Sequence, residues 1–234
     1  MTDYAAEEPH GPLVACFDNV WTVTGSVVMM PLMRLPRNMV VLRHDDELTL
    51  INAVRLSAGG MEALTALGKI KNVVRIGMHG MDDAWYVGEH GATLWAPEGM
   101  THARNQKTAQ VLAADNLPLP GLTLFSFGLT KSPEAALVYD VDGGLLITCD
   151  SVQNWVDTEG CSLPAKAVTH LMGFVKPAQI GPPWRKVMTP KGGSLKPDFQ
   201  RLVELEFRHL IGGHGALLRD SAKENLQVSI DREF

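Results

Sequence analysis

Histidines and carboxylates directly follow three apolar segments of this sequence. His79, Asp82 and Asp83 follow the first segment, Asp150 follows the second, and His214 follows the third. Glycine or another small residue flanks each group, which lets the backbone turn sharply and aim the side chains into a common crevice. Imidazoles and carboxylates that converge from separate loops can bind Zn²⁺, Mn²⁺ or Fe²⁺, because these ions accept mixed nitrogen and oxygen ligands. Two histidines and one carboxylate would be sufficient for one metal ion.

The same residue types also have structural uses, and the sequence leaves both interpretations open. The glycines beside His214 suit a tight turn with or without a metal, and Asp150 could equally cap a following helix. If metal affinity has been lost, Asp82, Asp83 and His214 could remain as hydrogen-bonded anchors of their loops. Cys149 stands next to Asp150, but it ends an apolar strand, where a buried thiol is mostly inert.

Composition restricts the class of protein and its partners. The 234 residues are 45% hydrophobic and 20% charged, as in ordinary globular proteins. The 21 basic and 26 acidic residues give a net charge of −5, and no window concentrates Lys and Arg as a phosphate-binding face requires. We therefore expect a small-molecule ligand and no nucleic acid, with a homodimer as the default assembly.

Cysteine use and hydropathy indicate the compartment. Cys16, Cys149 and Cys161 are an odd and widely spaced set, which suits reduced thiols better than secreted disulfides. The acidic start MTDYAAEEPHGP lacks an apolar signal sequence. No stretch reaches the ~20 apolar residues that a membrane span needs. We expect a cytoplasmic protein with no membrane segment.

The elements that must position these residues alternate between strands and helices. The first half predicts strands at 21–30, 39–43, 48–51, 70–76 and 92–96, and one helix at 57–68. The polar residues 44–47 predict a hairpin turn, and the helix has Ser57 as its N-cap and Gly68 as its stop. Strand, helix and strand form a βαβ unit, which delivers His79 to a loop at the carboxyl end of a strand.

The second half of the chain repeats this plan. It predicts strands at 122–127, 135–141 and 145–149, helices at 165–174, 198–208 and 217–226, and a short strand just before His214. Six prolines and five glycines make the segment 160–197 largely irregular. Two mostly antiparallel strand sets, each followed by helices, predict two packed sheets with helices outside. We expect one domain over residues 1–234.

Three tryptophans stand close in sequence to the candidate loops. Trp85, Trp155 and Trp184 could wall a substrate pocket or could close the core over the loops. The Pro-rich segment 180–188 could likewise gate a pocket or be plain irregular structure.

The order of these features resembles the metallo-β-lactamase superfamily. The segments MVVLRHDDELTLINAV, LLITCDSVQN and LIGGHG carry the resemblance, which extends over about residues 15–226. It implies a four-layer αβ/βα sandwich and hydrolysis of esters, thioesters, lactams or phosphodiesters with the help of bound metal. Within the superfamily, the chain is most similar to a branch in which the metal motif is reduced.

The superfamily's signature HxHxDH is incomplete in this sequence. Matching His79 to the first histidine puts Asp83 on the aspartate, but Met81 and Ala84 then replace the other two histidines. The alternative register puts Asp82 on the aspartate and loses both preceding histidines. A further histidine expected before the later hairpin is also absent, because residues 128–133 read GLTKSP.

The resemblance therefore implies a reduced set of ligands. Asp150 matches the bridging aspartate of two-metal members, and His214 matches the last histidine, so the implied metal ligands are His79, Asp83, Asp150 and His214. Asp83 and Asp150 are the candidate catalytic residues, as acceptors of a proton from water. Four ligands cannot serve two ions about 3.5–4 Å apart. We expect one Zn, Mn or Fe ion, or none.

Two functions remain open at this point. One is a metal-dependent hydrolase with a mononuclear site and an unidentified substrate. The other is a non-catalytic descendant that binds a small molecule or a partner protein through the same crevice. Fold alone does not choose between them, because function belongs to the site.

Overall fold

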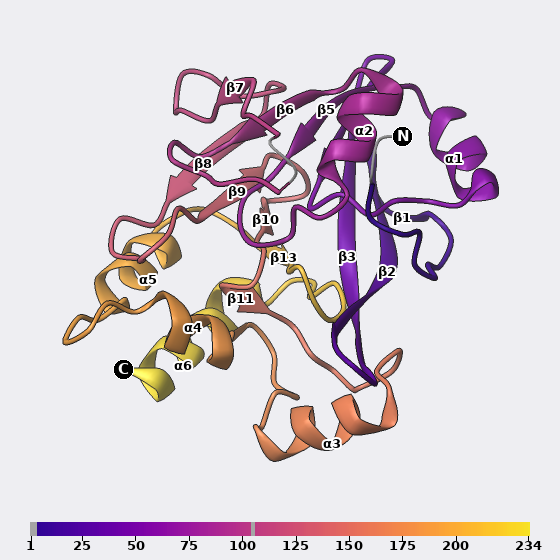
Figure 1. Ribbon diagram of the computed structural model, residues 1–234. Helices are drawn as coiled ribbons and strands as arrows, with labels where there is room; N and C mark the ends of the chain where they lie inside the picture. Colours follow the sequence, from indigo (N-terminus) through magenta and orange to yellow (C-terminus); the bar gives the residue numbers. More distant parts are fainter. Residues whose placement is uncertain (1–3, 104–105) are drawn as a thin grey trace.

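Two β-sheets packed face to face, with helices on both outer faces, make up the architecture (Figure 1). The computed structural model describes residues 4–103 and 106–234. The larger sheet has seven strands in the order β1 (Val14–Phe17), β2 (Val20–Met30), β3 (Met33–His44), β4 (Glu47–Ile51), β5 (Lys69–Val74), β6 (Thr93–Ala96) and β7 (Gln110–Val111).

The larger sheet is half antiparallel and half parallel. Strands β1 to β4 pair antiparallel, which confirms the predicted hairpin between β3 and β4. Strands β4 to β7 pair in parallel, so the expectation of a mostly antiparallel set is wrong for this half. The physical reason is that helices connect β4 to β5 and β5 to β6, and a helical crossover returns the chain in the same direction.

The smaller sheet has four strands in the order β13-β10-β9-β8. Their bounds are β8 (Leu122–Ser126), β9 (Ala135–Tyr139), β10 (Leu145–Ile147) and β13 (His209–Ile211), and a separate two-stranded sheet joins β11 (Val152–Gln153) to β12 (Gln179–Ile180). Strand β13 lies parallel to β10 at one edge. The carboxyl ends of β10 and β13 therefore meet on the same side of the sheet.

The described residues form six helices: α1 (Ala58–Thr65), α2 (Asp83–His90), α3 (Leu163–Leu171), α4 (Pro182–Met188), α5 (Lys196–Val203) and α6 (Ala222–Glu233). The predicted cap of α1 is confirmed, because the Ser57 side chain accepts a hydrogen bond from the Gly60 N–H. The segment expected to be irregular contains α4, because prolines at the first helical positions remove no intrahelical hydrogen bond. The last helix begins at Ala222 rather than Leu217.

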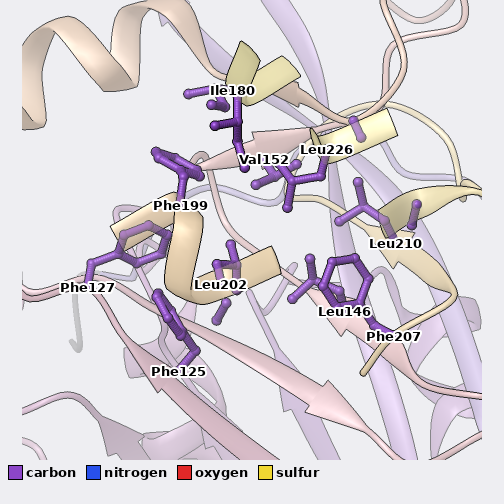
Figure 2. Packing of buried hydrophobic residues seen from close by; sticks show 14 of the residues in the cluster. Phe125, Phe127, Leu146, Val152, Ile180, Phe199, Leu202, Phe207, Leu210 and Leu226 are labelled. Carbon is purple, nitrogen blue, oxygen red and sulfur yellow. The ribbon is translucent and has the colours of Figure 1, made fainter. Parts of the chain in front are cut away.

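Three apolar clusters separate the four layers. Between the sheets, Val74 of β5 packs in one cluster with Leu137 and Ile147 of the smaller sheet. Outside the larger sheet, the cluster joins its strands to Leu64 of α1 and Tyr86 of α2. The third cluster covers the outer face of the smaller sheet, and Figure 2 shows its packing. This arrangement is the expected αβ/βα sandwich.

Strand alternation divides the smaller sheet between two of these clusters. Leu145 and Ile147 of β10 face the larger sheet, whereas Leu146 faces α5 and α6. In Figure 2, Phe199 and Leu202 of α5 lie against this outer face. Both faces of the sheet are therefore buried, which makes it a rigid support for the loops at its carboxyl end.

The β2–β3 hairpin extends well beyond the other strands of its sheet, and its tip lies beside α3 (Figure 1). The backbone around Ser162, which precedes α3, fixes this contact. Its N–H donates to the Arg34 carbonyl over 3.0 Å, and its hydroxyl donates to the Leu32 carbonyl over 2.6 Å. Within the described ranges, no helix is long and apolar enough to cross a membrane.

Phe199 tests the packing of the outer cluster. Its side chain is fully buried, with ring centroids 5.4 Å from Phe127 and 5.9 Å from Trp184. Phe199→Ala should lower the free energy of unfolding by about 3–5 kcal/mol, through lost burial and the cavity left behind. The control Val228→Ala, at a side chain that is 60% exposed, should change it by no more than about 0.5 kcal/mol. Urea unfolding with an unchanged slope is the measurement, and equal effects of the two variants would contradict this packing.

Candidate metal centre

Three of the four predicted ligands converge at the carboxyl ends of the strands. His79 lies in the loop between β5 and α2, Asp150 in the turn after β10, and His214 in the loop after β13. One ligand atom from each lies within 4.8 Å of the others. The fourth predicted ligand, Asp83, is not brought into this cluster.

The Asp150 carboxylate is the centre of the cluster. Its Oδ1 lies 3.1 Å from Nε2 of His214 and 3.4 Å from Nε2 of His79. The two imidazole rings meet edge to face, with centroids 4.7 Å apart. Both histidine side chains are less than 10% exposed, and Asp150 is 18% exposed. The three groups are shielded from water but reachable from one side.

A backbone carbonyl orients His214. Nδ1 of this histidine donates a hydrogen bond of 2.5 Å to the Pro36 carbonyl in β3, and the Trp155 ring stacks on the imidazole at 5.9 Å. With its proton on Nδ1, a neutral His214 presents the Nε2 lone pair to Asp150. A lone pair and a carboxylate oxygen at 3.1 Å repel unless a cation, either a proton or a metal ion, lies between them.

The donor set fits a small divalent ion. A tetrahedral ion with ligands about 2.1 Å away separates its ligand atoms by about 3.4 Å, close to the two spacings from Asp150. Nδ1 of His79 has no hydrogen-bond partner among the described residues, whereas His214 has the carbonyl partner that metal-binding histidines usually have. His79, Asp150 and His214 are thus the residues that would hold the ion.

Electrostatics favour the metal-binding forms of two of these groups. Burial lowers the pKa of His79, against the raising effect of Asp150, which favours the neutral imidazole. For Asp150, burial alone would raise the pKa, but attraction to His79 and hydrogen bonds from both histidines hold it well below its usual range. Without a metal ion, the ionised Asp150 is stabilised by protons on the imidazole nitrogens that face it, and a metal ion would take the place of those protons.

Strand β3 supports the loop that carries His214. The Asn38 side chain donates to the carbonyls of Gly212 and Gly215 over 3.1 and 2.7 Å, and its backbone N–H donates to Gly213 over 2.8 Å. Gly213 must lack a side chain, because a Cβ there would lie 2.8 Å from the Cys149 carbonyl oxygen. The close approach of the two loops depends on this glycine.

Asp82 anchors the His79 loop rather than binding an ion. Its carboxylate forms an ion pair with Arg37 of β3, and both side chains are less than 5% exposed. It also accepts a hydrogen bond of 2.8 Å from the backbone N–H of Arg55. Arg37 in turn donates to the carbonyls of Ser26 and Ala53. This buried network fixes the start of α2 against β3, as the loop-anchor interpretation expected for Asp82.

Asp83 is the first residue of α2 and is only 1% exposed. Neither carboxyl oxygen has a hydrogen-bond partner in the described part of the chain. Burial raises its pKa to about 7, with Asp82 adding to the rise and Arg75 opposing it. The structure therefore places Asp83 in the packing behind the His79 loop, where the sequence predicted a ligand and catalytic residue.

The sequence did not single out Glu134, which is a buried carboxyl behind the site. Its Oε2 would lie 2.6 Å from a Cβ at Gly77, so Gly77 is needed for this approach. Burial, then the negative charge of Asp150, raises the pKa of Glu134 well above its usual value. Burial and the same charge also raise the thiol pKa of Cys149, which agrees with an inert thiol. The sequence contains a signal for this residue, because Glu134 is a charged residue directly before the apolar strand β9.

A cavity of about 370 Å³ adjoins the cluster, and Asp150 and His214 belong to its lining. Trp155 and Trp184 wall it, as one interpretation expected. Trp85 does not line it and instead packs with Tyr86 and Arg55 on the far side of the larger sheet. The volume lies in the ~300–1,000 Å³ range of small-molecule sites.

Comparison with solved structures agrees with this fold. No protein-family model matches the chain, and no curated protein matches it. Solved structures do match. The DIM-1 metallo-β-lactamase is 13% identical over 98% of this chain and 100% of its own, with a TM-score of 0.65. The FIM-1 metallo-β-lactamase from Pseudomonas aeruginosa, in the mono-zinc form, is 14% identical over 95% and 96%, with a TM-score of 0.62.

A metallo-β-lactamase from Hirschia baltica is 16% identical, covers 94% of this chain and 98% of its own, and has a TM-score of 0.59. The layers of the structure and these structural matches agree on one fold. The chain has the metallo-β-lactamase fold, as the order of its motifs predicted. Its cluster of two histidines and one aspartate stands at the carboxyl ends of its strands.

Two adjacent aspartates should respond in opposite ways to loss of charge. Asp82→Asn leaves Arg37 buried without its ion pair and should cost about 3–5 kcal/mol of stability. Asp83→Asn removes a carboxyl whose pKa is about 7 in the folded state, against an ordinary value of 3.8. Between those pH values the folded state holds more protons, so wild-type stability falls as pH rises to about 7.

Relative to wild type, Asp83→Asn should therefore gain about 2–4 kcal/mol between about pH 4 and pH 8. Urea unfolding of wild type and both variants at each pH measures these differences. A loss of stability in Asp83→Asn that grows with pH would contradict the raised pKa, and a neutral Asp82→Asn would contradict the anchoring role.

Proposed function

We propose that this chain is a metal-dependent hydrolase that uses one divalent ion, held by His79, Asp150 and His214. The observation that carries the proposal is the meeting of two imidazole nitrogens and one ionised carboxylate beside a small-molecule cavity. Three protein ligands with access from one side are the usual arrangement of a catalytic zinc site. FIM-1 in its mono-zinc form is a precedent for one ion in this fold.

A bound ion at this place would supply Lewis acidity and lower the pKa of water. The chain's own residues do the rest. Pro36 fixes the ring of His214, and Gln153 donates to Oδ1 of Asp150 over 3.3 Å, which orients that carboxylate. Asp150 is the one carboxylate among the described lining residues. It is therefore the group placed to accept the proton of an attacking water, while the walls exclude bulk solvent from the substrate.

Asp83 has no direct part in this mechanism. It lies outside the cluster and does not belong to the described lining of the cavity. Its buried carboxyl instead lies in the first turn of α2. The reduced site therefore has three protein ligands, one fewer than the resemblance implied.

A small molecule is the partner that we infer. The net charge of −5 disfavours nucleic acid, and the cavity has the volume of a small-molecule site. The cysteines Cys16, Cys149 and Cys161 are all free thiols, which supports a cytoplasmic location for this activity.

Metal content and ester turnover test the proposal together. The protein is expressed with Zn, Mn and Fe supplied, and metal is measured by elemental mass spectrometry on wild type, His214→Ala and Asp150→Ala. Both substitutions should abolish a near-stoichiometric metal content and lower hydrolysis of p-nitrophenyl acetate by at least about a hundredfold, because each removes one of three ligands. Asp83→Asn and the surface control His170→Ala should keep both properties.

Two results would overturn the proposal. A folded wild type that takes up no metal would indicate a non-catalytic descendant that binds its ligand in the same cavity. Metal that survives in His214→Ala and Asp150→Ala but is lost in Asp83→Asn would place the ion elsewhere.

A further inference from the structure

The walls of the cavity are rich in methionine. Six of the eleven methionines of the chain line the cavity beside the metal centre, namely Met29, Met30, Met33, Met78, Met172 and Met188. Methionine is unbranched and polarisable, so it adapts to flexible apolar ligands. A wall of this kind suits an aliphatic chain better than a rigid polar ring system.

Four separate parts of the chain supply these walls: the tip of the β2–β3 hairpin, the loop before α2, and helices α3 and α4. The hydrogen bonds of Ser162 to Leu32 and Arg34 hold the hairpin to α3. The Trp155 indole N–H donates to Gln153 over 2.7 Å, so the polar edge of that wall is already satisfied. The N–H of Trp184, the other indole of the wall, has no hydrogen-bond partner among the described residues, but it is buried.

The walls of the cavity away from the metal centre carry no charge. Asp150 and His214 are the ionisable groups among the described residues of the lining, and no Lys or Arg of the described ranges joins them. A charged group on the part of a ligand that lies among the methionines would lose its hydration there without a countercharge. These walls therefore favour an uncharged chain.

The mouth of the cavity also leaves apolar side chains in water. Met29, Met30, Met78, Met172 and Val187 line it, and each is between 46% and 61% exposed. A group of exposed apolar side chains around a cavity marks a surface that a ligand covers. An aliphatic chain that ran from the metal centre outward would cover these residues in turn.

We propose that the substrate is an uncharged carboxylic ester with a medium-length aliphatic acyl chain, which lies among the methionines while its carbonyl group faces Asp150 and His214. The hydrolytic part of this statement rests on the proposed function, and the recognition of the chain does not. Water adds to the acyl carbon, the acyl C–O bond breaks, the alcohol leaves with one proton of the water, and a carboxylic acid remains. The acid ionises outside the apolar walls, which favours its release.

Affinity should rise with chain length. Each methylene that leaves water gains roughly fourfold in affinity, equivalent to about 0.8 kcal/mol. The increase from butanol to hexanol to octanol should therefore be about tenfold or more at each step while the chain still enters the cavity. In protein freed of metal by EDTA, octanoate should bind at least about tenfold more weakly than octanol, because its charge then meets that of Asp150 without a countercharge.

The binding experiment uses the full chain as purified and the uncharged fluorophore N-phenylnaphthylamine, displaced by each alcohol or carboxylate. Met172→Glu puts a carboxylate at the mouth and should weaken octanol binding by about tenfold or more. Leu171→Glu is the matched control, because Leu171 is the neighbouring residue, is 89% exposed and does not line the cavity. It should bind octanol as wild type does.

The turnover experiment uses p-nitrophenyl acetate, hexanoate and octanoate, and kcat/KM should rise with chain length in wild type and in Leu171→Glu but not in Met172→Glu. Chain-length-dependent binding without turnover of any ester would overturn the proposed hydrolase and the ester assignment, and leave a site for apolar ligands. Turnover without chain-length dependence, or octanoate bound as tightly as octanol by the metal-free protein, would overturn this inference and leave the hydrolase. Equal loss in Met172→Glu and Leu171→Glu would also overturn it.

Discussion

The buried ion pair between Arg37 and Asp82 is the interaction on which the arrangement of the site depends. Arg37 lies in β3 between Pro36, which orients His214, and Asn38, which holds the loop of His214. Three consecutive residues of one strand thus connect the two histidine loops. A buried pair of this kind adds little net stability, because desolvation offsets most of the attraction. Its contribution is to fix the distance between elements that are far apart in sequence.

Without a bound cation, the cluster lowers the free energy of unfolding. Asp150 keeps a charge in a shielded place, and its nearest neighbours are lone pairs or N–H groups of two imidazoles. Burial and the charge of Asp150 raise the pKa of the nearby Glu134 well above its usual value, which favours the uncharged carboxyl. Asp150 is the one carboxylate of the cluster. A single carboxylate suits one divalent ion with neutral histidines, because a second carboxylate anion would need a second cation.

Features that depend on short-range interactions could be predicted from the sequence, and features that depend on contacts between distant residues could not. Local patterns gave the β3–β4 hairpin, the cap of α1 and the strands that lead to His79, Asp150 and His214, because apolar periodicity and turn residues act over a few positions. Asp83 was predicted as a ligand, and the structure does not bring it into the cluster. Motif spacing placed it on the ligand position, but the first turn of α2 points it into the packing. The partner of Asp82 is 45 positions away, and no local signal can identify such a pair.

The cavity shows the same limit, because its methionines come from four separate segments and look like ordinary core residues in sequence. The hairpin tip that carries three of them extends beyond the other strands of the seven-stranded sheet, and Ser162 before α3 holds it (Figure 1). An isolated two-stranded ribbon has little stability of its own. The methionines of the hairpin tip and the metal ligands therefore lie in regions whose local free energies of unfolding differ. Evolution can vary the tip, and with it the choice of substrate, without touching the chemistry at the strand ends.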